Sequence, residues 1–380
     1  MFALTKQRKY SIIIVSTPPQ NAKKGMVKSM KHIPYDCIES SEFNEGMATI
    51  LTVAGVGFIN TAGEVVIPPI FEHIKKTQDT MLNTYYMFRE GLSTFGKDGK
   101  CGYMDKQGNT VISPEYDSAS PFHQGVAAVA KDGKWGAIDQ NGKTIIPLEY
   151  DFVQSPSEGV CGVFQKHRRC GYIDLSGNTV IPLTDRYMTT APFQCGVAVV
   201  EVGNWPPDLE KKANESDRDY LKRYSDAVIK AAQNNRYGAI NKKGELTVEL
   251  KYQYLSWFRE GLAAASIDGK KMYINTLGET VFEVPQYDQI GSFFEGLALV
   301  QSGKKYGCID TSGKLIIPTE YDSMPIFANK YAPVSKNGKW GLIDHSGAVR
   351  LPLEYDFVSS VENGYAVVRK DASWSIVNLT

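Results

Sequence analysis

The chain has 380 residues, of which 42% are hydrophobic, 11% aromatic and 22% charged, so it can bury a core and is not intrinsically disordered. Its 42 basic residues balance 42 acidic residues, which excludes a global field that would attract nucleic acid or an anionic membrane. The 34 glycines and 21 tyrosines favour turns and strands, and predict an all-β protein.

The first forty residues, 1–40, are predicted to be a degenerate N-terminal repeat or cap. The apolar run that follows Lys9 is much shorter than the core of a signal peptide and lacks a small-residue cleavage site, so a strand is expected there. No segment approaches the roughly 20 apolar residues of a membrane helix. The six cysteines form no Cys-x-x-Cys pair, which fits a reducing compartment. We therefore expect a cytoplasmic protein with no membrane partner.

One phrase recurs along the rest of the chain. It reads KDGKWGAIDQNGKTIIPLEYD from Lys131 to Asp151 and KNGKWGLIDHSGAVRLPLEYD from Lys336 to Asp356. Aligned on the aromatic–glycine pair, the copies repeat every 34 or 35 residues, and two insertions break this period. Such self-similarity predicts tandem repeats over 41–201 and 236–380, the last copy incomplete. A degenerate copy over Tyr10–Asp36 would bring the count to ten.

Each copy is predicted to form three antiparallel strands. Asp132 and Gly133 join the first two through a type I′ turn. The second strand carries the Trp-Gly pair and ends at an acceptor for backbone N–H groups, followed three residues later by a glycine in a left-handed conformation. Asn60, Asn241 and Asn275 fill the acceptor position in other copies, so it needs an acceptor more than a charge. The structural residues of two copies are Trp135, Gly136, Asp139, Gly142, Trp340, Gly341, Asp344 and Gly347.

The glycine of the Trp-Gly pair is expected to let a strand or ring of the next copy approach closely. The third strand contains a proline, which cannot donate to a sheet, so the strand should lie at an edge or bulge there. The prolines in step are Pro68, Pro114, Pro147, Pro182, Pro318 and Pro352.

A unit of three strands cannot bury its faces alone, so neighbouring copies must stack. We predict an open β-superhelix or solenoid of these units, because ten copies exceed the usual four to eight blades of a propeller. The alternative is a ring like a β-propeller. In its favour, the chain ends on a first and a second strand and begins on residues that could supply a third.

The insertion at 202–235 is the largest departure from the period. Its apolar spacing predicts a helix from about Pro207 to Gln233, with a break near 214–217 as an alternative. This helix either packs on the repeats or docks a partner protein. The residues expected to contact a partner are Trp205, Leu209, Tyr220, Leu221, Tyr224 and Val228.

Two further departures are smaller. The insertion Lys75–Tyr86 is predicted to be a turn of helix or a loop. At Gln165–Cys170 the tight hairpin turn is replaced by His167, Arg168 and Arg169, where a phosphate or an acidic partner could bind. Exposed hairpin tips are commonly charged, however, and that interpretation stays open.

No catalytic constellation is recognisable in the sequence. The five histidines show no metal-ligand spacing, and there is no nucleophile motif, phosphate-binding loop or dinucleotide fingerprint. The Glu-Tyr-Asp triplets, such as Glu149–Asp151, recur with the period, which favours a structural role over acid–base catalysis. We expect no enzyme activity, no cofactor and no metal.

The pattern E-G-x-A-x-V…G-K-W-G-x-I-D-x-x-G-x-x-I-I-P-x-x-Y-D resembles the WG (KWG) repeat family, which is found mostly in bacterial proteins. The resemblance implies a β-rich tandem array without an assigned activity and with a role in interaction. The first hypothesis is a non-enzymatic scaffold that binds another protein, as an accessory or regulatory subunit of a bacterial complex. The alternative is a recognition module for a glycan, a nucleotide or nucleic acid that uses exposed aromatic rings.

Overall fold

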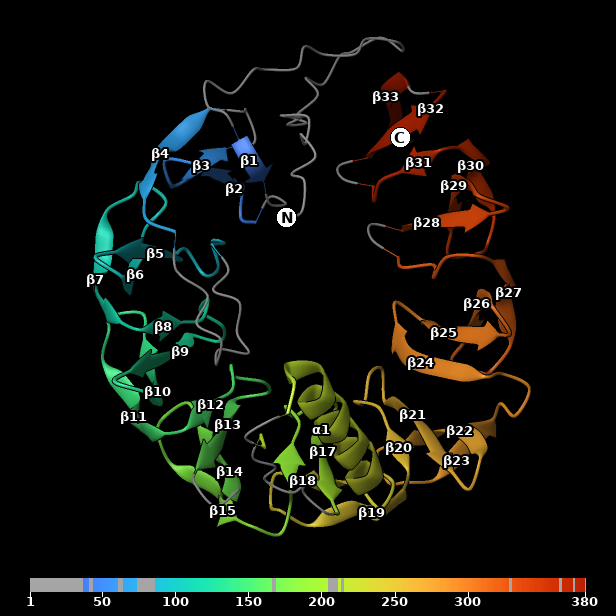
Figure 1. Ribbon diagram of the computed structural model, residues 1–380, viewed down its shortest axis with the longest axis horizontal. Coiled ribbons are helices and arrows are strands. Elements are labelled where there is room, and N and C mark those ends of the chain that lie inside the picture. Colours follow the sequence, from blue (N-terminus) through green and yellow to red (C-terminus); the bar gives the residue numbers. More distant parts are fainter. Residues whose placement is uncertain are drawn as a thin grey trace. The chain divides into compact units, whose positions relative to one another are not determined.

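The computed structural model describes residues 37–40, 44–60, 64–73, 86–165, 169–203, 211–212, 215–327, 330–361, 364–371 and 373–379. These residues form antiparallel sheets in tandem and one helix, which confirms the predicted all-β fold with an inserted helix (Figure 1). The predicted copy over Tyr10–Asp36 lies outside the described residues. The choice between an open superhelix and a ring stays a prediction.

The chain divides into two compact units, Met1–Lys166 with Gly171–Leu183, and His167–Cys170 with Thr184–Thr380. Apart from the ends of β14 and β15, the described sheets of the first unit have strand orders β1-β2-β3-β4, β5-β6-β7, β8-β9-β10-β11 and β12-β13-β14-β15. Their bounds are β1 Cys37–Ser40, β2 Met47–Thr52, β3 Val56–Asn60, β4 Val65–Phe71, β5 Ser93–Lys97, β6 Lys100–Met104, β7 Thr110–Tyr116, β8 Ser118–Ala119, β9 Val126–Lys131, β10 Lys134–Asp139, β11 Thr144–Tyr150, β12 Phe152–Val153, β13 Val160–Gln165, β14 Arg169–Asp174 and β15 Thr179–Thr184.

The described sheets of the second unit have orders β16-β17-β18-β19, β20-β21-β22-β23, β24-β25-β26-β27, β28-β29-β30 and β31-β32-β33. Helix α1, Asp217–Ala232, lies between β17 and β18 in the chain. The strand bounds are β16 Thr189–Thr190, β17 Val197–Val202, β18 Arg236–Asn241, β19 Leu246–Tyr252, β20 Tyr254–Leu255, β21 Leu262–Ile267, β22 Lys270–Asn275, β23 Thr280–Glu283, β24 Gln289–Phe294, β25 Leu297–Ser302, β26 Lys305–Asp310, β27 Leu315–Tyr321, β28 Tyr331–Lys336, β29 Lys339–Asp344, β30 Val349–Tyr355, β31 Phe357–Val358, β32 Tyr365–Lys370 and β33 Ser373–Asn378.

Many sheets contain a short strand that the sequence prediction of three strands missed. Ser118 and Ala119 form β8, which directly follows the Tyr-Asp pair of one copy and joins the sheet of the next by pairing with Ala130 and Val129. A strand of two residues is too short to show an alternating pattern, so no periodicity marks it. The sheets are therefore offset from the sequence repeat by one short strand.

The first long strand of a sheet is buried on both faces. In β9, Val126, Ala128 and Ala130 enter a cluster with Val163 of the following sheet. Ala127 and Val129 enter another cluster with Tyr103 of the preceding sheet. The sheet of β9 is thus covered on both sides by its neighbours, which explains the small apolar residues of this strand.

The glycine of the Trp-Gly pair allows a bulge within its own sheet. Trp135 faces Tyr150 and Ala137 faces Ile146, so residues 147–149 of β11 stand opposite Gly136 alone. A Cβ added to Gly136 would lie 2.5 Å from the Ile146 carbonyl oxygen and 2.8 Å from that of Pro147. Strand β11 also lies at the sheet edge, so the prediction of an edge strand with a bulge at proline is confirmed.

A copy that lacks this glycine also lacks the bulge opposite it. Met272 stands at the glycine position of β22, and its register with β23 runs from Met272–Glu283 to Tyr273–Phe282 without a shift, so the one irregularity lies later, between Tyr273 and Ile274. The bulge therefore accompanies the glycine, as the comparison of β10 with β22 shows.

The close approach between copies belongs to a different glycine, which corrects the expectation for the Trp-Gly pair. Gly177, at φ +87°, lies in the turn after β14, and a Cβ there would lie 2.6 Å from the Ile145 carbonyl oxygen of the preceding sheet. At the equivalent Gly142 a Cβ would make an ordinary contact, 3.6 Å from Ile112. The turn glycine, rather than the glycine of the Trp-Gly pair, packs against the neighbouring copy.

The acceptor residue of this turn acts as predicted. One carboxylate oxygen of Asp139 accepts hydrogen bonds of 2.9 Å from the backbone N–H groups of Asn141 and Lys143. The carboxylate of Asp344 accepts in the same way from Ser346 and Ala348. Asn241 accepts from Lys243 and Glu245, which confirms that an amide can fill the position.

Substituting Gly136→Ala should destabilise the fold more than Gly142→Ala. The first change forces a methyl group against the backbone of β11 and should cost about 3 kcal/mol. The second strains a left-handed position and should cost about 1 kcal/mol. Urea unfolding of both variants and the parent chain measures the difference, and equal losses would contradict the assigned role of Gly136.

Candidate protein-binding site

The connection between β17 and β18 is where the helix interrupts the repeats. In a typical sheet two residues make this turn, as Asp132 and Gly133 do with φ of 52° and 73°. Here the strand pairing ends at Val202 and Arg236, and helix α1 lies in the connection (Figure 1).

Hydrogen bonds join the two ends of this insertion, Glu201 on one side and Asn235 and Tyr237 on the other, which we call its neck. Glu201 accepts hydrogen bonds from the Asn235 side-chain amide at 2.6 Å and from the Tyr237 hydroxyl at 2.8 Å. Burial, together with this hydrogen bond, raises the pKa of Tyr237 to about 12. The Tyr237 contact joins the two strands directly, and the Asn235 contact ties the last inserted residue to β17.

Helix α1 starts later than the predicted Pro207. Among the described residues Lys211, Lys212, Glu215 and Ser216 are not helical, so the helix begins at the predicted break. The Ser216 hydroxyl accepts a 3.2 Å hydrogen bond from the Asp219 backbone and donates one of 2.6 Å to its carboxylate. Such a cap satisfies an N–H group that the helix cannot, and fixes the start there.

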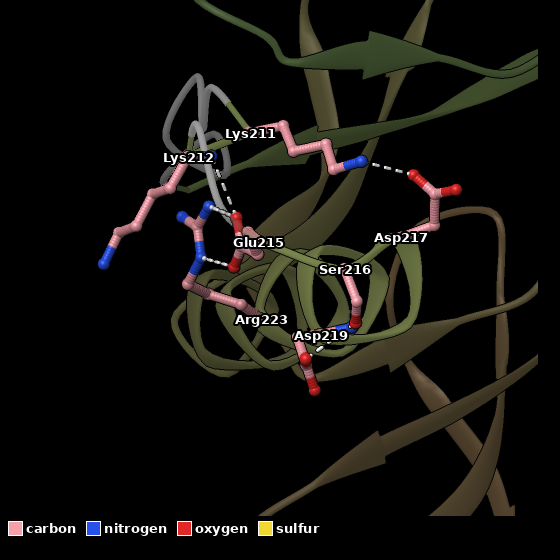
Figure 2. Close-up of polar contacts among 7 residues, drawn as sticks. All are labelled: Lys211, Lys212, Glu215, Ser216, Asp217, Asp219 and Arg223. Atoms are coloured by element: carbon pink, nitrogen blue, oxygen red, sulfur yellow. Dashed lines mark hydrogen bonds and ion pairs between the residues drawn. The ribbon is translucent and has the colours of Figure 1, made fainter.

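An ion-pair cluster ties the preceding residues to the first turns of the helix, as Figure 2 shows. The Arg223 guanidinium donates from Nε and Nη2 to the two carboxylate oxygens of Glu215, at 2.8 and 2.7 Å. Lys211 Nζ donates to Asp217 at 2.6 Å. Arg223 is the main cause that lowers the pKa of Glu215 to about 2.

The helix exposes much of its apolar surface. Leu221 is 62% exposed, Ile229 57% and Tyr224 40%. Tyr220 and Val228 are half-buried, and no residue of the helix with a described side chain is fully buried. The Tyr220 ring lies 6.2 Å from that of Tyr224 and beneath the Arg223 guanidinium at 5.7 Å.

Only some of the predicted contact residues lie in the described part of the chain. Tyr220, Leu221, Tyr224 and Val228 share one side of α1, at helical spacings of one, three, four, seven and eight residues. Arg169 is exposed at the start of β14. Trp205, Leu209, His167 and Arg168 lie outside the described residues, so their roles stay predictions.

The recurring aromatic rings are mostly interior. Trp135 is buried and Trp340 is half-buried. The tyrosines of the Tyr-Asp pairs are buried in four copies, at Tyr116, Tyr150, Tyr287 and Tyr321. These rings pack the core and are not available as stacking platforms for a ligand.

The recurring carboxylates hold neighbouring sheets together. Asp117 pairs with Lys100 of its own copy and accepts a 2.7 Å hydrogen bond from the Asp132 backbone in the next. The Lys100 ammonium is the main cause that lowers the pKa of Asp117. Glu115 pairs with Lys131 at 2.7 Å. The predicted structural role of these triplets agrees with such contacts.

A second set of contacts between copies was missed by the sequence reasoning. In the Glu-Gly turn, the side chain of the residue before the glycine accepts a hydrogen bond. The donor is the backbone N–H of the glycine in the same turn of the next copy. Glu90 accepts from Gly125 at 2.8 Å, and Gln124 accepts from Gly159 at 2.9 Å. The signal was present as the recurring E-G pair, whose positive φ values at Glu90 and Gly91 match the other turns.

No described group of three or more His, Cys, Asp or Glu side chains gathers as in a metal site. Within the described ranges no helix is long and apolar enough to cross a lipid bilayer.

These sheets define a tandem β-repeat protein with a single helical insertion in its described part. The family model for the WG containing repeat matches residues 57–77, 102–135, 135–166, 171–204, 237–270, 272–306, 306–340 and 340–374, well over half of the chain. The chain belongs to this WG repeat family. No curated protein matches it.

Solved structures give a likeness of fold. A crystal structure of the eukaryotic initiation factor is 9% identical with a TM-score of 0.51, and the match covers 87% of this chain and 92% of that one. The designed Ika8 protein is 10% identical, with a TM-score of 0.40 over 90% and 98% of the two chains. BamB from Moraxella catarrhalis is 10% identical, with a TM-score of 0.37 over 89% and 95%.

Acid should release the segment before helix α1. The pKa of Glu215 is lowered from an ordinary 4.5 to about 2, so its contribution is complete above pH 4.5 and is lost as the pH falls through 2. Glu215→Gln should speed amide exchange at 215–219 about threefold at neutral pH. Hydrogen exchange followed by mass spectrometry measures this. Glu249→Gln, which breaks the 2.9 Å surface pair with Lys251, is the control and should leave 215–219 unchanged.

Proposed function

We propose that this chain is a non-enzymatic β-repeat scaffold that binds another protein through helix α1, as an accessory or regulatory subunit. The observation that carries the proposal is the exposure of Leu221 and Tyr224, three residues apart on one side of a helix without a fully buried side chain among those described. An amphipathic helix usually buries its apolar face against its own protein, and this one does so only in part. Exposed apolar surface of this kind is typical of a docking site.

The fold does not require the helix. In other copies the same connection is a turn of two residues, as at Asp132 and Gly133. Here Glu201 accepts hydrogen bonds from Asn235 and Tyr237 at the point where the insertion leaves the sheet. The repeats provide a rigid base, and the helix provides a singular feature that the period does not explain. Partner binding is the function that best accounts for both.

The alternative of a glycan, nucleotide or nucleic-acid module has less support. It needs exposed rings in a row, whereas Tyr116, Tyr150, Tyr252 and Tyr321 are buried. The balanced charge of the chain also provides no general attraction for a polyanion.

Leu221→Asp should weaken partner binding at least tenfold, because it places a charge in the centre of the apolar contact. Leu277→Asp is the matched control, since Leu277 is a leucine of similar exposure, 66%, in the turn between β22 and β23. The measurement is quantitative co-purification from the native host at equal expression. Equal recovery of the partner by both variants would reject α1 as the docking element.

Replacing residues 203–235 by Asp-Gly should abolish partner capture and leave the sheets intact. The replacement restores the turn of the sibling copies after Val202 and before Arg236. Far-ultraviolet circular dichroism should lose helical signal only, and the thermal midpoint should stay within about 4 °C of the parent. Collapse of the strand signal would mean that the helix is part of the fold.

A further inference from the structure

We infer that the partner presents an amphipathic helix whose flank carries carboxylates, and that this flank lies against Arg218 and Lys222. The inference rests on the proposed function and specifies the chemistry of the partner. It follows from the shape of the exposed ridge of α1 and from the charges beside it.

The exposed ridge suits a helical partner. Leu221 and Tyr224 are exposed and three residues apart, and the half-buried Val228 follows four residues later, along a helix of 16 residues that spans about 24 Å. Ridges with this spacing fit into the groove between the side-chain rows of another helix. A ridge one side chain wide offers little to a flat or extended partner.

The flank of the ridge beyond Leu221 carries two basic residues and, farther along the helix, the exposed Ile229. Arg218 and Lys222 are exposed, one helical turn apart, and neither makes an ion pair with any described residue. Asp226 follows Lys222 by one further turn without pairing with it, and lies farther from the ridge. Like charges at this spacing repel each other, and an acidic partner would relieve that repulsion.

The other charges near the ridge are already engaged. Asp217, which continues the ridge toward the helix start, pairs with Lys211. Arg223 pairs with Glu215 on the opposite flank. The uncompensated charge beside Leu221 is therefore positive, and electrostatic complementarity selects an acidic flank on the partner.

A second copy of the chain fits this surface poorly. Two antiparallel copies of α1 related by a two-fold axis would place the same flank against itself, so Arg218 and Lys222 would approach their own equivalents. A lipid surface also fits less well. The helix carries Asp217, Asp219 and Asp226 among few apolar residues, whereas membrane-surface helices have a broad apolar face.

Two synthetic peptides test the inference against the full chain. Both have the same length and the same leucine and alanine stripe, and one flank carries glutamates in the first peptide and glutamines in the second. Fluorescence anisotropy should show the glutamate peptide binding about fivefold more tightly at low salt. The preference should disappear at high salt, and also in the double variant Arg218→Gln/Lys222→Gln, while Leu221→Ala should weaken both peptides.

Several outcomes would overturn the acidic partner. These are equal binding of the two peptides, binding of neither, and a preference that survives in the double variant with an unchanged thermal midpoint. Binding to phosphatidylglycerol vesicles that the double variant abolishes, without peptide binding, would replace the protein helix by a lipid surface. If Leu221→Asp still reduces co-purification of the native partner, the scaffold function stands and only the partner chemistry falls. If it does not, both fall.

Discussion

The sharing of cores between neighbouring sheets is the constraint on which the rest of the structure depends. A sheet of three or four short strands has two apolar faces and too little area to be stable alone. Strand β9 shows the solution, since Val126, Ala128 and Ala130 enter one core and Ala127 and Val129 enter the next. No copy can therefore change its interior without affecting two neighbours, which keeps the aromatic, small apolar and glycine positions in step along the chain.

The same constraint assigns the recurring polar residues. Asp117 holds Lys100 and the next hairpin, and Glu90 holds the next Glu-Gly turn. Their side chains are committed to joining sheets, so a charge that repeats with the period is poor evidence of catalysis or binding. Residues that depart from the period are not needed to join neighbouring sheets. Helix α1 is the largest departure that the structure describes, and its exposed residues are therefore the better guide to function.

Much of the fold could be predicted from the sequence because turns have strict local chemistry. The Asp-Gly pair and the Asp139 turn require specific residue types, so both turns can be predicted from the sequence alone. The two residues of β8 gave no periodic signal, and their strand exists only because the next copy supplies a partner. The role of Gly136 was misassigned for a related reason. A glycine signals a close approach, but the sequence does not say which backbone approaches.

The candidate site was predictable only in outline. The apolar spacing indicated a helix, yet its start depended on whether Ser216 would cap it, and the spacing could not distinguish packing from docking. The contacts at the neck of the insertion bear on the choice between packing and docking. Strands β17 and β18 pair over six residues and Glu201 also accepts from Tyr237, so their register has support outside the helix. Lengthening a connection between strands that are already paired costs little, about 0.6 kcal/mol for each doubling. The helix can thus persist without packing tightly on the repeats, and its leucine and isoleucine can stay exposed.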